Sequence, residues 1–333
     1  MDLAQVSMTL VLLVLLALAF DFLNGFHDAA NSIATVVSTG VLKPWQAVIW
    51  AAVFNVLAWA VFHLSVAATV GKGIIDPDFV DSRVIFGALI GAISWNLITW
   101  YYGIPSSSSH ALIGGLIGSA LTTAGVAPLL WPGILKTAAF IFVAPLLGMT
   151  LGALIMLIVS WISFRQMPRR ADRWYRRLQL VSSAAYSLGH GGNDAQKTMG
   201  VIWLLLIANG LTTEDRLPVW VVMSCFLAIG LGTMFGGWRI VKTMGQRITK
   251  LKPAGGFAAE TAGSITLFTA THFGIPVSTT HTITGAIIGV GTTRGTSAVR
   301  WGVAGNIVIA WIVTIPASAA IAGLAWWIGG LFF

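Results

Sequence analysis

The stretch NGFHDAANSIAT at residues 24–35 is echoed about half a chain later by HGGNDAQKTMGV at residues 190–201. The aspartates in these stretches, Asp28 and Asp194, lie 166 residues apart in a chain of 333 residues. A second pair, GIPSSSSHALIGGLIG and GIPVSTTHTITGAIIG, is offset by 171 residues. The chain is therefore an internal duplication, and each copy carries two small polar motifs inside apolar sequence. In membrane proteins, polar breaks at matching positions of two repeats point to a binding site at the repeat interface.

The composition of the chain is typical of a membrane protein. Apolar residues make up 56% and charged residues only 9%, against roughly 25% charged residues in soluble domains. Several apolar stretches approach the roughly 20 residues that a helix needs to cross a bilayer. They are residues 7–22, 47–70, 85–102, 133–164, 218–237, 258–273 and 303–333. The single cysteine, Cys225, excludes an internal disulfide and offers no metal-ligand pattern. We therefore expect an all-α polytopic protein of the cell (inner) membrane.

Basic residues gather in two short segments. The first holds Arg165, Arg169, Arg170, Arg173, Arg176 and Arg177, and the second holds Arg239, Lys242, Arg247, Lys250 and Lys252. Short loops rich in Lys and Arg face the cytoplasm, which explains the net charge of +8 without a nucleic-acid partner. Shifted back by the repeat offset, the second segment falls on residues 73–86, which carry aspartates instead. Matching loops of opposite charge should lie on opposite faces of the membrane, so we expect the two halves to be inverted.

This pattern divides the chain into two repeats. The first repeat spans residues 1–163, a short cytoplasmic Arg-rich linker spans residues 164–177, and the second repeat spans residues 178–333. Inverted duplication needs an odd number of crossings in each half, and the apolar stretches favour about five. Residues 7–40 and 178–210 are each too long for one straight crossing. We therefore expect broken or re-entrant helices at the repeated motifs.

The first motif pair is rich in residues that compete with a helix for backbone hydrogen bonds. Asn, Asp and Ser side chains offer the backbone other partners, and N–H groups freed by a break form an anion site at the next helix start. Asn24, Asp28, Asn31 and Ser32 in the first copy match His190, Asp194, Lys197 and Thr198 in the second. A plain helix cap is the alternative interpretation for either copy alone. Because the aspartate recurs at the same place in both copies, we favour a binding site.

The second motif pair places hydroxyl groups at a helix start. Pro105 or Pro276 ends one helix, because proline disfavours the helical conformation of the residue before it. The hydroxyl run that follows is Ser106, Ser107, Ser108 and Ser109 in the first copy and Ser278, Thr279 and Thr280 in the second. Hydroxyls and free amides at a helix N-terminus can donate hydrogen bonds to a tetrahedral oxyanion. The glycines behind them also predict close helix packing, and the two interpretations are compatible. These glycines are Gly114, Gly115, Gly118, Gly285 and Gly289.

The four motifs, in this order, resemble the inorganic phosphate transporter (PiT) family. An HD or ND motif followed by P-x-S-[ST]-[ST]-H occurs in both halves, and NGFHDAAN with NDAQK is most similar to the bacterial low-affinity phosphate permeases. The resemblance covers essentially the whole chain. It implies symport of inorganic phosphate with sodium or protons, and in some bacterial members transport of a neutral metal–phosphate complex. The phosphate site that it implies comprises Asp28, Asn31, Ser107, Ser108, Ser109, Asp194, Ser278, Thr279 and Thr280.

Three residues depart from the sodium-coupled members of that family. His27 replaces the usual first asparagine, Lys197 replaces the last asparagine of the second motif, and Asn55 stands where a glutamate is common. A lysine beside Asp194 could supply the charge that sodium supplies in relatives, and an imidazole beside Asp28 titrates near neutral pH. We therefore expect His27 and Lys197 to tune the charge of the site and the coupling ion to be a proton rather than sodium. A purely structural Lys197–Asp194 ion pair is the alternative.

The remaining residues of interest receive supporting roles. The resemblance makes Glu260 a coupling-ion residue. Asn24 and Asn193 flank the aspartates, and His110 and His281 end the two hydroxyl runs at matching positions. We expect these four residues to orient the motifs by hydrogen bonds rather than to bind the substrate.

Other functions stay open on the sequence alone. A sulfate carrier would use the same helix starts, but sulfate has no proton near neutral pH to donate to Asp28 and Asp194. Ser, His and Asp side chains also suit a membrane-embedded hydrolase, although duplication of the whole site in inverted form argues against an enzyme. We expect no cofactor and no resident metal. The expected partners are inorganic phosphate, a coupling cation, the bilayer and, left open, a divalent metal carried with phosphate and a second copy of the chain in a homodimer.

Overall fold

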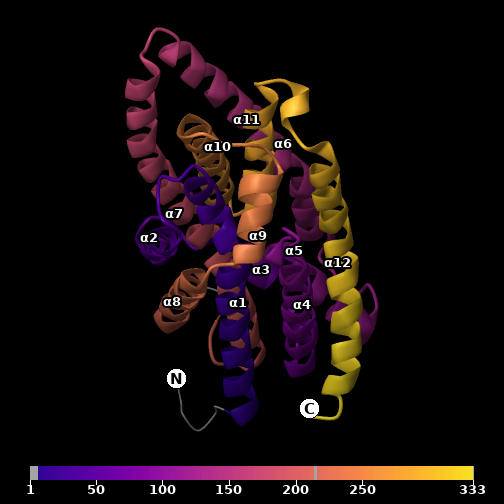
Figure 1. Ribbon diagram of the computed structural model, residues 1–333. Coiled ribbons are helices and arrows are strands. Elements are labelled where there is room, and N and C mark those ends of the chain that lie inside the picture. Colours follow the sequence, from indigo (N-terminus) through magenta and orange to yellow (C-terminus); the bar gives the residue numbers. More distant parts are fainter. Residues whose placement is uncertain (1–6, 214–215, 333) are drawn as a thin grey trace.

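The computed structural model describes residues 7–213 and 216–332, which form a bundle of helices (Figure 1). The first half contains α1 (Met8–Ser38), α2 (Pro44–Leu57), α3 (Ser65–Gly73), α4 (Ser82–Tyr102), α5 (Ser108–Ala124) and α6 (Trp131–Ser163). The second half contains α7 (Pro168–Ala208), α8 (Val219–Phe235), α9 (Trp238–Lys242), α10 (Pro253–His272), α11 (Thr279–Thr292) and α12 (Trp301–Gly329). Shorter turns are η2 (Ala58–Ala60), η3 (Pro77–Phe79), the π turn η4 (Thr243–Arg247) and η5 (Thr296–Ala298).

Several of these helices suit a bilayer. Within the described ranges, α1, α4, α6 and α12 are long and apolar enough to cross a membrane. Two further crossings are added if each bent pair of consecutive helices is counted as a single crossing. These pairs are α2 with α3, bent by 82°, and α8 with α9 and η4, bent by 62°. Large apolar side chains such as Leu15, Trp161 and Phe235 are exposed on the outside of the bundle, as expected where helices face lipid. The prediction of an all-helical polytopic membrane protein is confirmed.

The two halves repeat the same order of elements with opposite direction. The start of α1 and the end of α12 lie at one end of the bundle, and the α6–α7 connection lies at the other (Figure 1). Helices α1 and α7 pack side by side. Thr39 near the end of α1 bonds to Gln179 near the start of α7, whereas Asp21 of α1 bonds to Thr198 in the later part of α7. The two helices that carry the first motif pair therefore run antiparallel, as inversion of the halves requires.

The second motif pair breaks the chain into two hairpins. Helix α4 ends at Gly103 and α10 is followed by Gly274, both in the left-handed conformation that glycine adopts without strain, at φ 66° and 62°. The chain then reverses into α5 and α11, which have 17 and 14 residues and are shorter than the roughly 20 residues of a full crossing. Trp311, well inside α12, donates to the backbone oxygen of Pro105. The α4–α5 hairpin therefore turns inside the bundle, and the break expected at this motif pair is confirmed.

No break occurs at the first motif pair. Helix α1 runs through residues 24–35 as one helix of 31 residues, and α7 runs through residues 190–201 as one helix of 41 residues. The expected interruption there was wrong. The Asn31 side chain does not compete for its own backbone, because it donates to hydroxyls at the start of α11.

Two segments expected as basic loops are largely helical. The Arg-rich linker contributes its last ten residues, 168–177, to α7, which begins with a proline at its first position and gains an Asp172–Arg176 ion pair at 2.9 Å. Much of residues 239–252 forms α9 and η4 alongside α1. Arg239 lies over the rings of Trp100 and Tyr101 at the end of α4. The ion pair of Asp172 with Arg176 and the stacking of Arg239 on aromatic rings thus stabilise helical structure in these two segments. The charge pattern alone had predicted loops there.

Glycine faces join the two halves to each other. Helix α5 packs on α12 and α11 packs on α6, so each hairpin rests on the last helix of the opposite half. A Cβ atom at Gly118 would lie 2.2 Å from the Ala319 oxygen, and one at Gly289 would lie 2.0 Å from the Met149 oxygen. The predicted close packing by these glycines is confirmed, and these contacts hold the two repeats against each other.

We expect Gly289→Val to destabilise the protein strongly. Real Cβ atoms do not approach an oxygen as closely as 2.0 Å, so α11 would have to move away from α6, and overpacking of this kind costs about 1–3 kcal/mol or more. Thermal unfolding of the purified protein, followed by tryptophan fluorescence, should show a lower midpoint. Gly305→Val is the matched control, because a Cβ at Gly305 on α12 meets nothing within 4 Å. Equal midpoints for both variants would contradict the packing argument.

Candidate functional site

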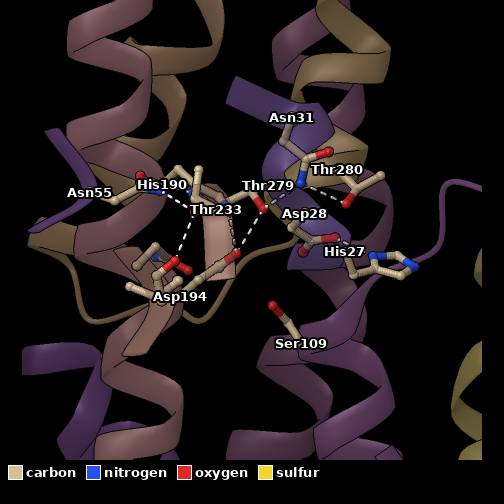
Figure 2. A network of polar contacts seen from close by, with 12 residues as sticks. His27, Asp28, Asn31, Asn55, Ser109, His190, Asp194, Thr233, Thr279 and Thr280 are labelled. Atoms are coloured by element: carbon tan, nitrogen blue, oxygen red, sulfur yellow. Dashed lines mark hydrogen bonds and ion pairs between the residues drawn. The ribbon is translucent and has the colours of Figure 1, made fainter. Parts of the chain in front are cut away.

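The antiparallel pair α1 and α7 brings the two repeated aspartates together. Ligand atoms of Asp28, Asp194 and His190 all lie within 4.8 Å of one another, and all three residues are buried. Figure 2 shows Asp28 on α1 facing Asp194 across the tip of the α10–α11 hairpin. Along α1, the first apolar core cluster ends at Phe20 and the second begins at Ala30. The acidic pair thus lies between two apolar clusters.

Lys197 balances the charge of Asp194 and ties three segments together. Its Nζ lies 2.5 Å from Oδ1 of Asp194, one turn earlier on α7. The same ammonium donates to the hydroxyl of Ser109 at the start of α5 and, at 2.7 Å, to the backbone oxygen of Val277 before α11. His190 lies on the other side of Asp194, with Nε2 3.3 Å from Oδ2. One buried cation therefore connects the aspartate to both hairpins.

His27 and Asn193 occupy equivalent places in the two repeats. His27 approaches Oδ1 of Asp28 with Nδ1 at 2.6 Å and the Thr99 hydroxyl of α4 with Nε2 at 3.1 Å. Asn193, the residue before Asp194, donates from Nδ2 to the Thr271 hydroxyl of α10 at 2.9 Å. Each residue thus joins its motif helix to the first arm of the hairpin in its own half. His27 differs from Asn193 in that it also contacts the neighbouring aspartate.

The hairpin tips supply hydroxyl groups. Asn31 donates from Nδ2 to the hydroxyls of Thr279 and Thr280, at 3.1 and 2.9 Å, and the Thr279 hydroxyl donates to Oδ2 of Asp194 at 3.0 Å (Figure 2). Two buried atoms of the motif residues, Oδ1 of Asn31 on α1 and Oγ of Ser108 at the start of α5, have no hydrogen-bond partner within the protein. Buried polar groups are nearly always satisfied by protein, water or ligand. These atoms therefore keep the capacity to bond to a small polar ligand.

The other hydroxyls and the two motif histidines have structural contacts. Ser107 and Ser278 cap α5 and α11, each accepting a hydrogen bond at 3.2 Å from the backbone N–H three residues on. His110 and His281 meet edge to face with ring centroids 4.7 Å apart, and His281 stacks on Trp311 at 3.8 Å. The tips of the two hairpins are thus joined by aromatic contact, and the expected orientation of the motifs by hydrogen bonds of these histidines stays a prediction.

Glu260 lies apart from the aspartates, in a second polar cluster. It accepts hydrogen bonds from Thr35 of α1 at 2.6 Å, from Ser182 of α7 at 2.5 Å and from Gln179 of α7 at 3.0 Å. The hydroxyl of Thr39 donates to the same Gln179 at 2.9 Å. Sequence reasoning missed these partners. The spacing of Thr35 and Thr39, one and two turns beyond Asn31 on α1, was the available signal.

Asn55 and Asn24 complete the surroundings of the aspartates. Asn55 of α2 contacts Nδ1 of His190 through Oδ1 at 3.1 Å and donates to Thr233 of α8 at 2.9 Å. It therefore holds His190 beside Asp194, a role that the sequence did not reveal. Asn24 is buried on α1, and its Oδ1 has no partner within the protein.

Two inverted repeats whose polar motifs meet at their interface, inside an all-helical membrane protein, are typical of membrane transporters. Residues 24–170 and 163–322 match the model of the phosphate transporter family, and the chain belongs to that family. Over 332 residues it is 60% identical to a probable low-affinity inorganic phosphate transporter of Rhizobium meliloti, with 99% of each chain covered. A protein of the same description from Bacillus subtilis is 45% identical, with 97% of this chain and 98% of the relative covered.

A solved structure described as the sodium-dependent phosphate transporter has the same fold. It superimposes with a TM-score of 0.85 at 25% sequence identity, over 98% of this chain and 100% of that chain. The resemblance seen in the motifs is therefore confirmed. The protein is an integral multi-pass membrane transporter and not an enzyme.

Proposed function

We propose that this protein takes up inorganic phosphate by secondary symport, with the substrate held between Asp28 and Asp194. The observation that carries this proposal is the pair of buried aspartates from inverted repeats, with ligand atoms within 4.8 Å and hairpin hydroxyls beside them. Phosphate keeps a proton near neutral pH and can donate it to a carboxylate. Sulfate, which has no such proton, would meet only repulsion from the two carboxylates, so phosphate is the better fit.

Each of the proposed phosphate ligands has a polar side-chain atom. It lies either at the tip of a hairpin or on the surface where α1 and α7 face each other. They are Asp28, Asn31, Ser107, Ser108, Ser109, Asp194, Ser278, Thr279 and Thr280. The starts of α5 and α11 add backbone N–H groups and the positive ends of two helix dipoles. The unpartnered Ser108 hydroxyl and Asn31 oxygen support this set, because a bound oxyanion with one proton can both accept and donate.

We also propose that the coupling ion is a proton. Lys197 already provides a fixed positive charge 2.5 Å from Asp194, so a sodium ion would meet repulsion there. His27 lies with Nδ1 2.6 Å from Oδ1 of Asp28, so a proton can pass between the imidazole and that carboxylate. Glu260, surrounded by the hydroxyls of Thr35 and Ser182, is a further place for the coupling cation. Sodium coupling is the second candidate, favoured by the sodium dependence named for the structural neighbour.

A divalent metal ion could travel with the phosphate. Asp28, His190 and Asp194 form a carboxylate and imidazole set that suits divalent ions, and their ligand atoms lie within 4.8 Å of one another. Lys197 repels a metal ion beside Asp194 as it repels sodium, so this cargo ranks below free phosphate. In that case the metal would be part of the cargo, neutralising the phosphate before it enters the apolar interior. Chelation of divalent ions would then lower phosphate uptake, whereas free phosphate as the cargo predicts no effect of a chelator.

The decisive experiment is uptake of labelled phosphate into proteoliposomes, with the sodium gradient, the pH gradient and added magnesium varied separately. We expect an inward pH gradient to drive uptake with no sodium present, and excess sulfate not to compete. Uptake that is absent without sodium, and saturates as sodium is added, would reject the proton assignment. Lys197 would then be a structural partner of Asp194.

We expect Thr279→Val and Ser108→Ala to weaken phosphate binding. Each removes a hydroxyl from a buried oxyanion site and leaves a ligand atom unpaired, at a cost of about 1–3 kcal/mol, or about 5- to 150-fold in half-saturation. Titration of the uptake rate against phosphate concentration measures the change. Thr282→Val is the matched control, because the Thr282 hydroxyl bonds to the backbone of its own helix at 2.9 Å. Half-saturation that stays constant in both test variants would assign the hydroxyls to packing alone.

A further inference from the structure

Asp21 is a buried carboxylate that the proposed phosphate site does not use. It belongs to a file of polar residues on α1, formed by Asp21, Asn24, Asp28, Asn31 and Thr35 at intervals of three or four residues. This spacing places all five on one face of the helix, and all five are buried. Asp21 lies about two turns from Asp28, toward the start of α1. The file therefore continues past the central aspartates on the side opposite to Thr35 and Glu260.

The immediate contacts of Asp21 are neutral. Its Oδ1 accepts a hydrogen bond at 2.9 Å from the hydroxyl of Thr198 on α7. The Cys225 thiol of α8 and the amide of Asn24 lie beside the same carboxyl group. Oδ2 of Asp21 and Oδ1 of Asn24 are buried without a hydrogen-bond partner. One carboxylate oxygen is thus left without a hydrogen bond to offset its removal from water.

Within residues 7–213 and 216–332, no counter-charge compensates this carboxylate. The ionisable groups that face it are Asp194 of α7, already paired with Lys197, and the Cys225 thiol of α8. Helix α2 has no ionisable side chain, and the arginine of α4, Arg83, lies over a tryptophan ring of α12. Among the ion pairs of the described residues, none includes Asp21. An isolated charge in such surroundings is unfavourable by several kcal/mol, and such groups become neutral instead.

The repeat itself does not require an acid here. The matching position in the second half is Ser187, which is 166 residues further on. Its hydroxyl donates to the backbone oxygen of Ser183 at 2.9 Å, so its hydrogen bond is made within α7 itself. The same helix packing is therefore built with a small neutral residue in one copy and a carboxylate in the other.

The ligands around Asp21 fit a proton better than a metal cation. A hard cation takes about six or more oxygen ligands, whereas the site offers the two unpartnered oxygens of Asp21 and Asn24 and the hydroxyl of Thr198. The neighbouring Cys225 sulfur is a soft ligand that hard cations disfavour. A proton needs only the unpartnered oxygen.

We propose that Asp21 carries the coupling proton, an inference that rests on the proposed symport of phosphate. The proton binds Oδ2 while the site is open toward the end of the molecule that holds the start of α1. The carboxylate becomes a neutral carboxylic acid, which the surrounding apolar cluster accommodates. The same proton leaves to water after the site has opened to the other side, and the carboxylate is restored. One proton therefore crosses with each phosphate.

The test compares Asp21→Asn with the wild type and with Asp172→Asn, in full-length protein reconstituted into liposomes. Asparagine mimics the neutral acid but cannot release a proton. Asp172→Asn makes the same chemical change at an exposed carboxylate paired with Arg176. Two rates are measured: exchange of labelled for unlabelled phosphate at equal pH, and accumulation driven by an inward pH gradient with internal pH recorded by a trapped dye. For each coupled proton, one pH unit supports about tenfold accumulation.

We expect Asp21→Asn to keep exchange and to lose the tenfold accumulation together with the proton flux, while Asp172→Asn keeps all three. An infrared band of a protonated carboxylic acid should also disappear in Asp21→Asn. If Asp21→Asn accumulates phosphate and moves protons as the wild type does, the proposal is overturned. It is also overturned if exchange is lost with accumulation, because the role would then be structural. Absence of phosphate exchange in the wild type would instead reject the proposed function itself.

Discussion

Replacing Asp194 with asparagine is expected to abolish phosphate uptake, and Asp28→Asn is expected to do the same. The two carboxylates are opposed copies of one group from inverted repeats, and both would accept the proton of a bound phosphate. Asparagine at position 194 also offers Lys197 and the Thr279 hydroxyl an amide in place of the charged acceptor that both use. Uptake of labelled phosphate by cells or proteoliposomes measures the effect.

Correct folding has to be checked separately for these two variants. Size-exclusion profiles and the amount of protein in the membrane should match those of Asp172→Asn, which loses an exposed carboxylate. Asp28→Asn is the safer test of function, because the partner of Asp28 is a histidine that can be neutral. If either variant transports phosphate normally while folded, the site does not depend on both halves and the two-fold arrangement is wrong.

Lys197→Met should produce the largest loss of stability among single substitutions at the site. The Nζ atom is buried and joins Asp194 to the starts of both α5 and α11. Removing one partner of a buried ion pair costs about 3–5 kcal/mol, because the other charge stays uncompensated. The midpoint of thermal unfolding, measured by tryptophan fluorescence, is expected to fall clearly below that of the wild type.

A double variant separates the charge effect from lost packing. Lys197→Met combined with Asp194→Asn leaves no uncompensated charge, so part of the lost stability should return even though transport does not. Lys136→Met is the control, because Lys136 on α6 is exposed. A midpoint for Lys197→Met equal to that of the control would mean that the ammonium contributes little to holding the hairpins.

Features that depend on local chemistry or on repetition could be predicted from the sequence. The proline and hydroxyl runs at Pro105 and Pro276 predicted a chain break, and the break follows each α4 or α10 helix directly. The recurrence of Asp28 at Asp194 predicted that both halves contribute to one site, and the two side chains do lie together. Such inferences need only neighbouring residues or the repeat offset.

Features that depend on distant partners could not be predicted. The polar residues of the first motif suggested a broken helix, yet α1 is continuous because Asn31 bonds to Thr279 and Thr280, about 248 residues away in sequence. The surroundings of Glu260 were missed for the same reason, since Thr35 and Gln179 come from two other helices. Nothing in a single sequence pairs these residues before the helices are assembled.

The crossed packing of the glycine faces also constrains how the protein is made. Helix α6 leaves the ribosome with the first half, but its partner α11 is synthesised only near the end of the chain. The surface of α6 that packs against Gly285 and Gly289 therefore stays exposed to lipid while most of the second half is inserted. Chains usually fold from the N-terminal side as they emerge, but here neither half can reach its final packing alone. Assembly in the membrane is complete only when α11 and α12 have been inserted, because these helices pack against α6 and α5 of the first half.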